Sequence, residues 1–135
     1  MQTEIIIKTQ GQGLYEFTGD AARFVSRCGV DSGLLTVFVR HTSCSLLIQE
    51  NADPDVQRDL QGFFDRTVPE GMTWLRHTSE GADDMPAHIK AAMTQVSLSI
   101  PIKDRAMLLG TWQGIFLFEH RHHPHSRQIV LHLSP

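Results

Sequence analysis

Residues 34 to 48 read Leu34-Leu-Thr-Val-Phe-Val-Arg-His-Thr-Ser-Cys-Ser-Leu-Leu-Ile48, with two apolar runs on either side of a short polar segment. The first run, which extends to Arg40, is rich in Val, Phe and Thr, residues that fit the pleated surface of a strand. We expect the second run, Leu46-Leu-Ile48, to be the strand that pairs with it. The polar segment between them begins with His41.

Short apolar or alternating runs predict six further strands, and capping residues together with helical spacing predict three helices. The strands are 5–8, 14–17, 96–102, 108–109, 115–118 and 128–133, and the helices span about 18–28, 53–66 and 86–93. The first two strands flank the turn Gly11-Gln-Gly13, which predicts a hairpin. We expect Thr18 or Asp20 to cap the first helix and Gly29 to end it.

The second helix is predicted to begin with Asp53 as its N-cap and Pro54 at its first position. Its apolar residues Val56, Leu60, Phe63 and Phe64 recur at helical spacing and predict an amphipathic helix.

Strands that come in runs and do not alternate with helices favour antiparallel sheets over parallel βαβ units. The sequence therefore predicts an α+β fold, with mostly antiparallel β-sheets forming a sandwich-like core and two to three helices. The 135 residues suit a single domain, residues 1–135.

Composition excludes several classes of protein. The net charge of −3 argues against a general electrostatic grip on nucleic acid or on an anionic membrane. No apolar run approaches the length of a membrane span, and the N-terminus does not resemble a secretion signal. Two cysteines, Cys28 and Cys44, lack metal-site spacing. We therefore expect a cytoplasmic protein with two free thiols.

The stretch His77-Thr-Ser-Glu-Gly-Ala-Asp-Asp-Met-Pro-Ala-His88 gathers two histidines and three carboxylates. Asp84 and His88 are four residues apart, which places them on one face of a helix. Imidazoles and carboxylates together are a common ligand set for a divalent metal such as zinc. The alternatives are general acid–base chemistry by the same groups, or an N-capped surface helix without a metal, with Asp83 or Asp84 as the N-cap.

Four segments in this order resemble one known family. They are His41-Thr-Ser-Cys-Ser45, Gln49-Glu-Asn-Ala-Asp-Pro-Asp-Val56, His77 through His88, and Ser97-Leu-Ser-Ile-Pro-Ile102 followed by Gly110-Thr-Trp-Gln-Gly114. The chain thus resembles the YjbQ-like family, often labelled secondary thiamine-phosphate synthase. One position departs from the family pattern: Arg105 stands where a glycine is usual. Either this turn is reshaped, or Asp104 takes the positive φ angle.

The resemblance implies a homotrimer that joins hydroxymethylpyrimidine diphosphate to thiazole phosphate with loss of pyrophosphate. Spacing and resemblance together make His77, Asp84 and His88 the expected ligands of a divalent metal (Zn, Mn or Mg), with Asp83 as an alternative to Asp84. Glu80 is then expected to orient a histidine or to act as a general base. A phosphorylated small molecule is the expected partner.

Further residues are expected to form the walls of this site. His41 is interpreted as an anion-binding or acid-catalytic group, with Thr42, Ser43 and Ser45 as phosphate donors and Glu50 and Asn51 nearby if the hairpin is tight; the alternative for His41 is a polar strand-end cap. Trp112 is expected to stack on a pyrimidine ring beside Gln113 and Thr111, or else to hold a tight bend.

Glu119 is a candidate catalytic group, and Arg121, with Arg127, a candidate phosphate ligand. The run His122-His-Pro-His125 is interpreted as a solvated turn. Two other functions stay open: a non-catalytic protein that binds or senses a phosphorylated metabolite, and a metal-dependent phosphoester hydrolase.

Overall fold

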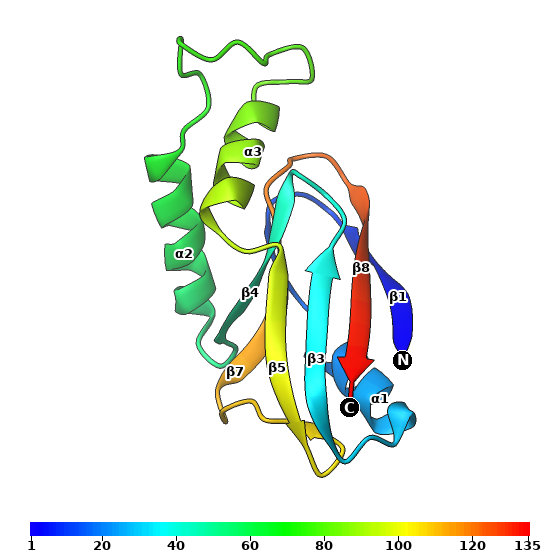
Figure 1. The fold of residues 1–135 in the computed structure, drawn as a ribbon. Helices are drawn as coiled ribbons and strands as arrows, with labels where there is room; N and C mark the ends of the chain where they lie inside the picture. Colours follow the sequence, from blue (N-terminus) through cyan, green and yellow to red (C-terminus); the bar gives the residue numbers. More distant parts are fainter.

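The computed structural model describes residues 1–135 and contains eight strands and three helices (Figure 1). Their order is the predicted one: β1 (Gln2–Thr9), β2 (Gly13–Glu16), α1 (Thr18–Cys28), β3 (Ser32–Val39), β4 (Cys44–Glu50), α2 (Pro54–Thr67), α3 (Asp84–Met93), β5 (Ser97–Lys103), β6 (Ala106–Met107), β7 (Gln113–Glu119) and β8 (His125–Ser134). Only the short strand β6 does not overlap its predicted range, 108–109, since it begins two residues earlier.

The strands form two antiparallel sheets, so the predicted α+β class is confirmed. One sheet has five strands in the order β1-β8-β3-β5-β6, and the other has three in the order β2-β7-β4. Alternate residues of the strands meet in one apolar core, to which β3 contributes Leu35, Val37 and Val39 and α1 contributes Ala21 and Val25. This period-two burial is the reason that the strand positions were legible in the sequence.

Both predicted hairpins are wrong. β1 pairs with β8, so that Ile5 lies opposite Ile129, and β2 pairs with β7, so that Leu14 lies opposite Phe118. β3 and β4 belong to different sheets, since β3 lies between β8 and β5 while β4 pairs with β7. The segment 40–43 therefore crosses from one sheet to the other and does not close a turn. The crossing buries Leu46 of β4 against the opposite sheet.

Helices α2 and α3 lie side by side next to the three-stranded sheet, and a long connection joins them at one end (Figure 1). Asp53 caps α2 as predicted, accepting the N–H of Asp55 at 2.9 Å. Phe64 packs edge-to-face on Phe118 of β7, with ring centroids 5.4 Å apart. Phe63, in contrast, is 57% exposed. The apolar face of α2 is thus narrower than its spacing predicts.

Two turns show where backbone conformation was predictable. Gly29 ends α1 with φ of 66°, as expected for a helix C-cap. The predicted caps Thr18 and Asp20 are wrong, because α1 has no side-chain cap. Asp104 and Arg105 both adopt positive φ, 51° and 61°, in the turn between β5 and β6. None of the three helices combines the length and the apolar character needed to cross a membrane.

Candidate metal centre

Three side chains converge where the long connection enters α3. His77 comes from the connection, Asp84 is the first residue of α3, and His88 follows one helical turn later. Asp84 Oδ2 lies 2.7 Å from His77 Nε2 and 3.2 Å from His88 Nε2. One ligand atom from each residue lies within 4.8 Å of the other two, so the group can hold a metal ion.

A backbone hydrogen bond fixes the orientation of the His88 ring. His88 Nδ1 lies 2.9 Å from the carbonyl oxygen of Thr42. Because a carbonyl only accepts, Nδ1 carries a proton, and Nε2 is the ring nitrogen that faces Asp84 and would bind a metal. This arrangement, in which the second ring nitrogen is held by a carbonyl, is common among metal-binding histidines. It also joins α3 to the segment that crosses between the sheets.

Arg121 holds the acidic end of α3. Its Nη1 donates to Asp84 Oδ1 at 2.6 Å, and its Nε donates to Asp83 Oδ2 at 2.9 Å. Its Nη2 donates to the carbonyl of Glu80 at 3.0 Å. The arginine thus occupies one oxygen of Asp84 and leaves Oδ2 to the histidines. Three of its five N–H groups are engaged by these acceptors and its side chain is 13% exposed, which leaves little of Arg121 for the phosphate contact expected of it.

The two neighbouring aspartates have different surroundings. Asp83 Oδ2 also accepts the N–H of His122 at 2.9 Å, and Asp83 makes no side-chain cap to α3. Asp84, not Asp83, is therefore the carboxylate that faces the histidines. Burial raises the pKa of Asp84, but the hydrogen bond with His77 and the charge of Arg121 outweigh burial, and the net pKa is lowered. Asp84 is thus an ionised oxygen donor at neutral pH.

The matching family model describes a UPF0047 protein, YjbQ-like, and covers residues 3–135. The chain is 53% identical over 133 residues to a UPF0047 protein of Synechocystis, which covers 98% of this chain and 90% of that protein. It is 49% identical over 105 residues to UPF0047 protein YjbQ of Escherichia coli O157:H7, covering 78% and 75%.

The chain belongs to the YjbQ-like family.

Solved structures agree with this YjbQ-like assignment. An uncharacterised YjbQ/UPF0047 protein of Clostridium acetobutylicum is 33% identical, with a TM-score of 0.89 over 98% of this chain and 99% of that one. A hypothetical protein of Aeropyrum pernix K1 is 26% identical, with a TM-score of 0.90 over 99% and 98%. The resemblance seen in the sequence is thus confirmed at the level of the family. The names of these relatives state no activity.

In this YjbQ-like protein the crossing segment contacts the group of His77, Asp84 and His88 (the metal cluster, named for the ion it could hold) through the Thr42 carbonyl. His41 Nε2 instead accepts the backbone N–H of Gln128 at 2.8 Å. Burial and the charge of Arg127 lower the pKa of His41, so its ring is neutral at pH 7. Ser43 Oγ accepts from Arg127 Nη2 at 3.0 Å. These contacts hold the crossing segment against β8.

Glu119 of β7 and Arg127 of β8 form a buried pair that links the two sheets. Arg127 Nε donates to Glu119 Oε1 at 2.8 Å, and a second guanidinium nitrogen bonds the other carboxylate oxygen. Thr9 also donates to Glu119 Oε1, at 2.7 Å. Burial raises the pKa of Glu119, but the hydrogen bonds from Arg127 and Thr9 lower it by more, so the net pKa is lowered and the carboxylate is ionised. Both charged groups are thus buried and bonded to each other.

The remaining expected site residues lie at the other end of β4 and β7. Glu50 ends β4, and six residue steps of about 3.3 Å separate it from Cys44, so the two ends are about 20 Å apart. The expectation that Glu50 and Asn51 lie near His41 is therefore wrong within one chain, because it assumed a hairpin.

At that far end the polar side chains support the backbone. Asn51 Nδ2 donates to Glu16 Oε2 at 3.0 Å, and Gln113 Oε1 accepts the N–H of Gly110 at 2.7 Å. Thr111 is exposed in the same bend, and the Trp112 side chain is 63% exposed. The bend thus presents a free indole, but not to the metal cluster of the same chain.

One polar cluster went unnoticed in the sequence. His120 is fully buried, and its Nε2 lies 2.9 Å from Ser45 Oγ, while its Nδ1 has no partner. His122 and His123, interpreted as part of a solvated turn, are indeed exposed. His120 directly follows β7, and its ring packs on Phe118 with centroids 4.4 Å apart, on the face that Phe64 of α2 covers, whereas His122 and His123 lie farther along the loop.

Proposed function

We propose that this protein is a divalent-metal-dependent enzyme whose substrate carries a phosphate group. The observation that supports it is the placement of Asp84 Oδ2 between His77 Nε2 and His88 Nε2. Two imidazoles and one carboxylate are the ligand set of several catalytic zinc sites, which keep an open position for water or substrate. The hydrogen bonds to the Thr42 carbonyl and from Arg121 orient two of the three ligands, as an outer ligand sphere does.

The reaction we favour is thiamine-phosphate formation, the activity linked to the family by resemblance. The bond between the benzylic carbon and the diphosphate oxygen breaks, and its electron pair leaves with pyrophosphate. The thiazole nitrogen lone pair forms the new carbon–nitrogen bond. A divalent cation at the cluster supplies positive charge where the leaving group gains negative charge. No proton is transferred, so a neutral His41 and an engaged Glu119 are compatible with this chemistry.

A metal-dependent phosphoester hydrolase is the second candidate, and Glu80 supports it. Its side chain is exposed and close enough to Asp84 to influence the pKa of Asp84. A carboxylate at the mouth of a metal site can take a proton from the attacking water. Glu80→Gln separates the two reactions, because it is expected to slow hydrolysis at least tenfold and to leave the transfer within twofold of wild type.

The test of the main proposal begins with metal analysis of protein purified without an affinity tag. We expect close to one zinc or manganese per chain. His77→Ala and His88→Ala should lower metal content and reduce turnover of hydroxymethylpyrimidine diphosphate with thiazole phosphate by about 100-fold. His123→Ala is the matched control, because His123 is exposed and its side chain makes no hydrogen bond. Full turnover in both alanine variants would refute the proposal, whereas tight metabolite binding without turnover would indicate a binding protein.

We also propose that the protein is a homotrimer in the cytoplasm. The outward face of the five-stranded sheet exposes Ile6, Leu34 and Phe38, which supports burial against another copy. Two free cysteines support a reducing compartment. Light scattering should give three times the 15.2 kDa mass of the chain; a single-chain mass at micromolar concentration would contradict the trimer.

A further inference from the structure

We infer that the substrate of the metal cluster carries one uncharged ring or a similarly compact apolar group, bound in a pocket beside His77. This pocket has a volume of about 230 Å³ and lies between the long connection and the first turn of α3. Its apolar lining comes from Met72, Leu75, Met85 and Pro86. The inference rests on the proposed function and deepens it by assigning the pocket that binds the apolar part of the substrate.

The pocket and the metal cluster share a wall. His77 lines the pocket and also places its Nε2 2.7 Å from Asp84 Oδ2. A molecule whose phosphate is at the cluster can therefore extend past the His77 ring into the pocket. Pro86 is buried and Met85 half-buried in the same helical turn that carries Asp84. The apolar wall and the carboxylate are thus held by one rigid element.

The size and chemistry of the pocket limit its occupant. An apolar cavity of about 150 Å³ is sufficient to bind benzene, whereas drug-sized ligands need about 300 Å³ or more. The volume of 230 Å³ therefore fits one ring with small substituents. No carboxylate, lysine or arginine lines the pocket, and Thr78 and His77 are its polar side chains. A charged ring would lose hydration there without gaining a partner.

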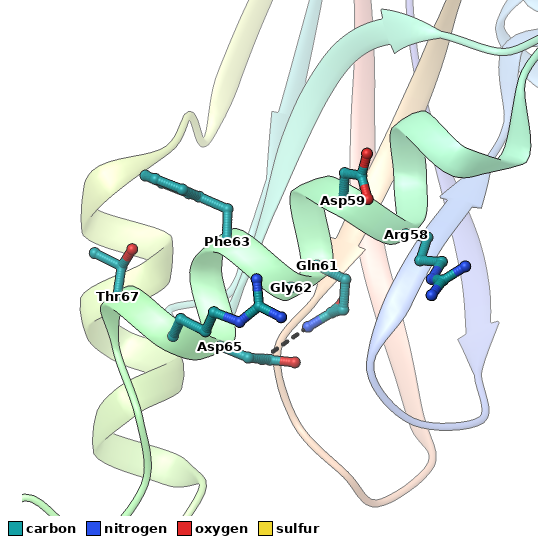
Figure 2. Close-up of a pocket in the computed structure, with 8 residues that line it drawn as sticks. Arg58, Asp59, Gln61, Gly62, Phe63, Asp65 and Thr67 are labelled. Atoms are coloured by element: carbon teal, nitrogen blue, oxygen red, sulfur yellow. Dashed lines mark hydrogen bonds between the residues drawn. The ribbon is translucent and has the colours of Figure 1, made fainter.

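A second, larger cavity is a poor alternative. It has a volume of about 530 Å³ and lies along α2, where Figure 2 shows the side chains of Arg58, Asp59 and Asp65 around Gly62. One apolar side chain, Phe63, lines it, and none of the three metal-cluster residues does. Four charged side chains line it, and it lacks the nearby ligand atoms that would hold the phosphate of such a substrate.

Two probes test the inference on the zinc-loaded wild-type protein by calorimetry. Benzylphosphonate and methylphosphonate carry the same anionic group, and the benzyl compound adds one uncharged ring. We expect benzylphosphonate to bind at least tenfold more tightly. Equal affinities would overturn the inference and leave the metal site standing, whereas failure of both compounds to bind would overturn the proposed function and this inference with it.

A variant then locates the ring. Ala82 is an exposed lining residue, so Ala82→Leu fills part of the pocket without entering the core. We expect the preference for benzylphosphonate to fall below threefold, with methylphosphonate affinity unchanged within threefold. Leu108→Ala, at a residue that is 56% exposed elsewhere on the surface, is the matched control and should retain the preference. An undiminished preference in a folded Ala82→Leu protein would place the ring outside this pocket.

Discussion

Acidification to pH 5 should weaken the fold through His120, and His120→Gln should remove that part of the effect. The imidazole is fully buried, next to the buried Lys90, and accepts or donates a single hydrogen bond, with Ser45. Burial, followed by the charge of Lys90, lowers its pKa from 6.5 to about 3. The folded protein therefore keeps this ring neutral over a pH range in which the unfolded chain binds a proton.

The sign and the size follow from linkage. A group with a lowered pKa contributes stability that is complete above its unfolded pKa of 6.5 and is lost as the pH falls toward the folded value. With the folded pKa at about 3, lowering the pH from 7 to 5 reduces the free energy of unfolding by about 2 kcal/mol through this residue. His41 shifts in the same direction, but it is present in both proteins and cancels in the comparison.

The assay is urea unfolding of wild type and His120→Gln at pH 7 and pH 5, with EDTA present so that loss of a metal does not contribute. Glutamine does not titrate in this range, and its amide can still bond Ser45. The variant should lose about 2 kcal/mol less than wild type on acidification, whereas His123→Gln, at an exposed position, should behave as wild type. Equal losses in wild type and His120→Gln would show that this ring does not stay neutral in the folded state.

Two further predictions concern substitutions to or from glycine. Arg105→Gly should raise the free energy of unfolding by roughly 0.5–1 kcal/mol, because a left-handed backbone costs a side-chain-bearing residue about 1–2 kcal/mol and glycine gives back part of that in chain entropy; chemical denaturation measures it, and Asp104→Gly should gain less. Gly114→Ala should destabilise by about 1–3 kcal/mol, because its Cβ would lie 3.1 Å from Asn51 Cβ and would push the Glu16 carboxylate away from its hydrogen bonds with Thr18 and Asn51. Gly62→Ala, which meets nothing within 4 Å, should not lower the melting temperature, and equal losses in the two alanine variants would contradict the steric reason.

The positions of the strands and helices were legible in the sequence because burial repeats with a local period. The partners of the strands were not. Leu34–Ile48 contains two well-marked strands, and nothing within it states that β4 pairs with β7, which lies more than 60 residues later in the chain. The polar segment 41–43 has no glycine or asparagine to favour a tight turn, and that was the available warning against a hairpin.

In the candidate site, too, the groups that are close in sequence could be predicted and the long-range contacts could not. His77, Asp84 and His88 could be grouped from the sequence because a short connection and one helical turn bring them together. The groups that orient them come from far away: the Thr42 carbonyl reaches His88 across 46 residues, and Arg121 reaches Asp84 across 37. The sequence analysis singled out Thr42 and Arg121 but expected them to bind phosphate, whereas in the structure they hydrogen-bond to His88 and Asp84.

The structure instead makes Arg121 the neighbour that decides which carboxylate oxygen is free. Its bond to Asp84 Oδ1 leaves Oδ2 for the two histidines, and its bonds to Asp83 and to the Glu80 carbonyl hold the connection against α3. Three of the five N–H groups of Arg121 are engaged in this way and its side chain is 13% exposed, so little of the guanidinium is left for a phosphate. If the substrate is phosphorylated, as we propose, its phosphate needs another positive group, and a cation bound at the histidine–aspartate cluster would supply one. The engagement of Arg121 by the two aspartates is therefore consistent with the cation that we propose at this cluster.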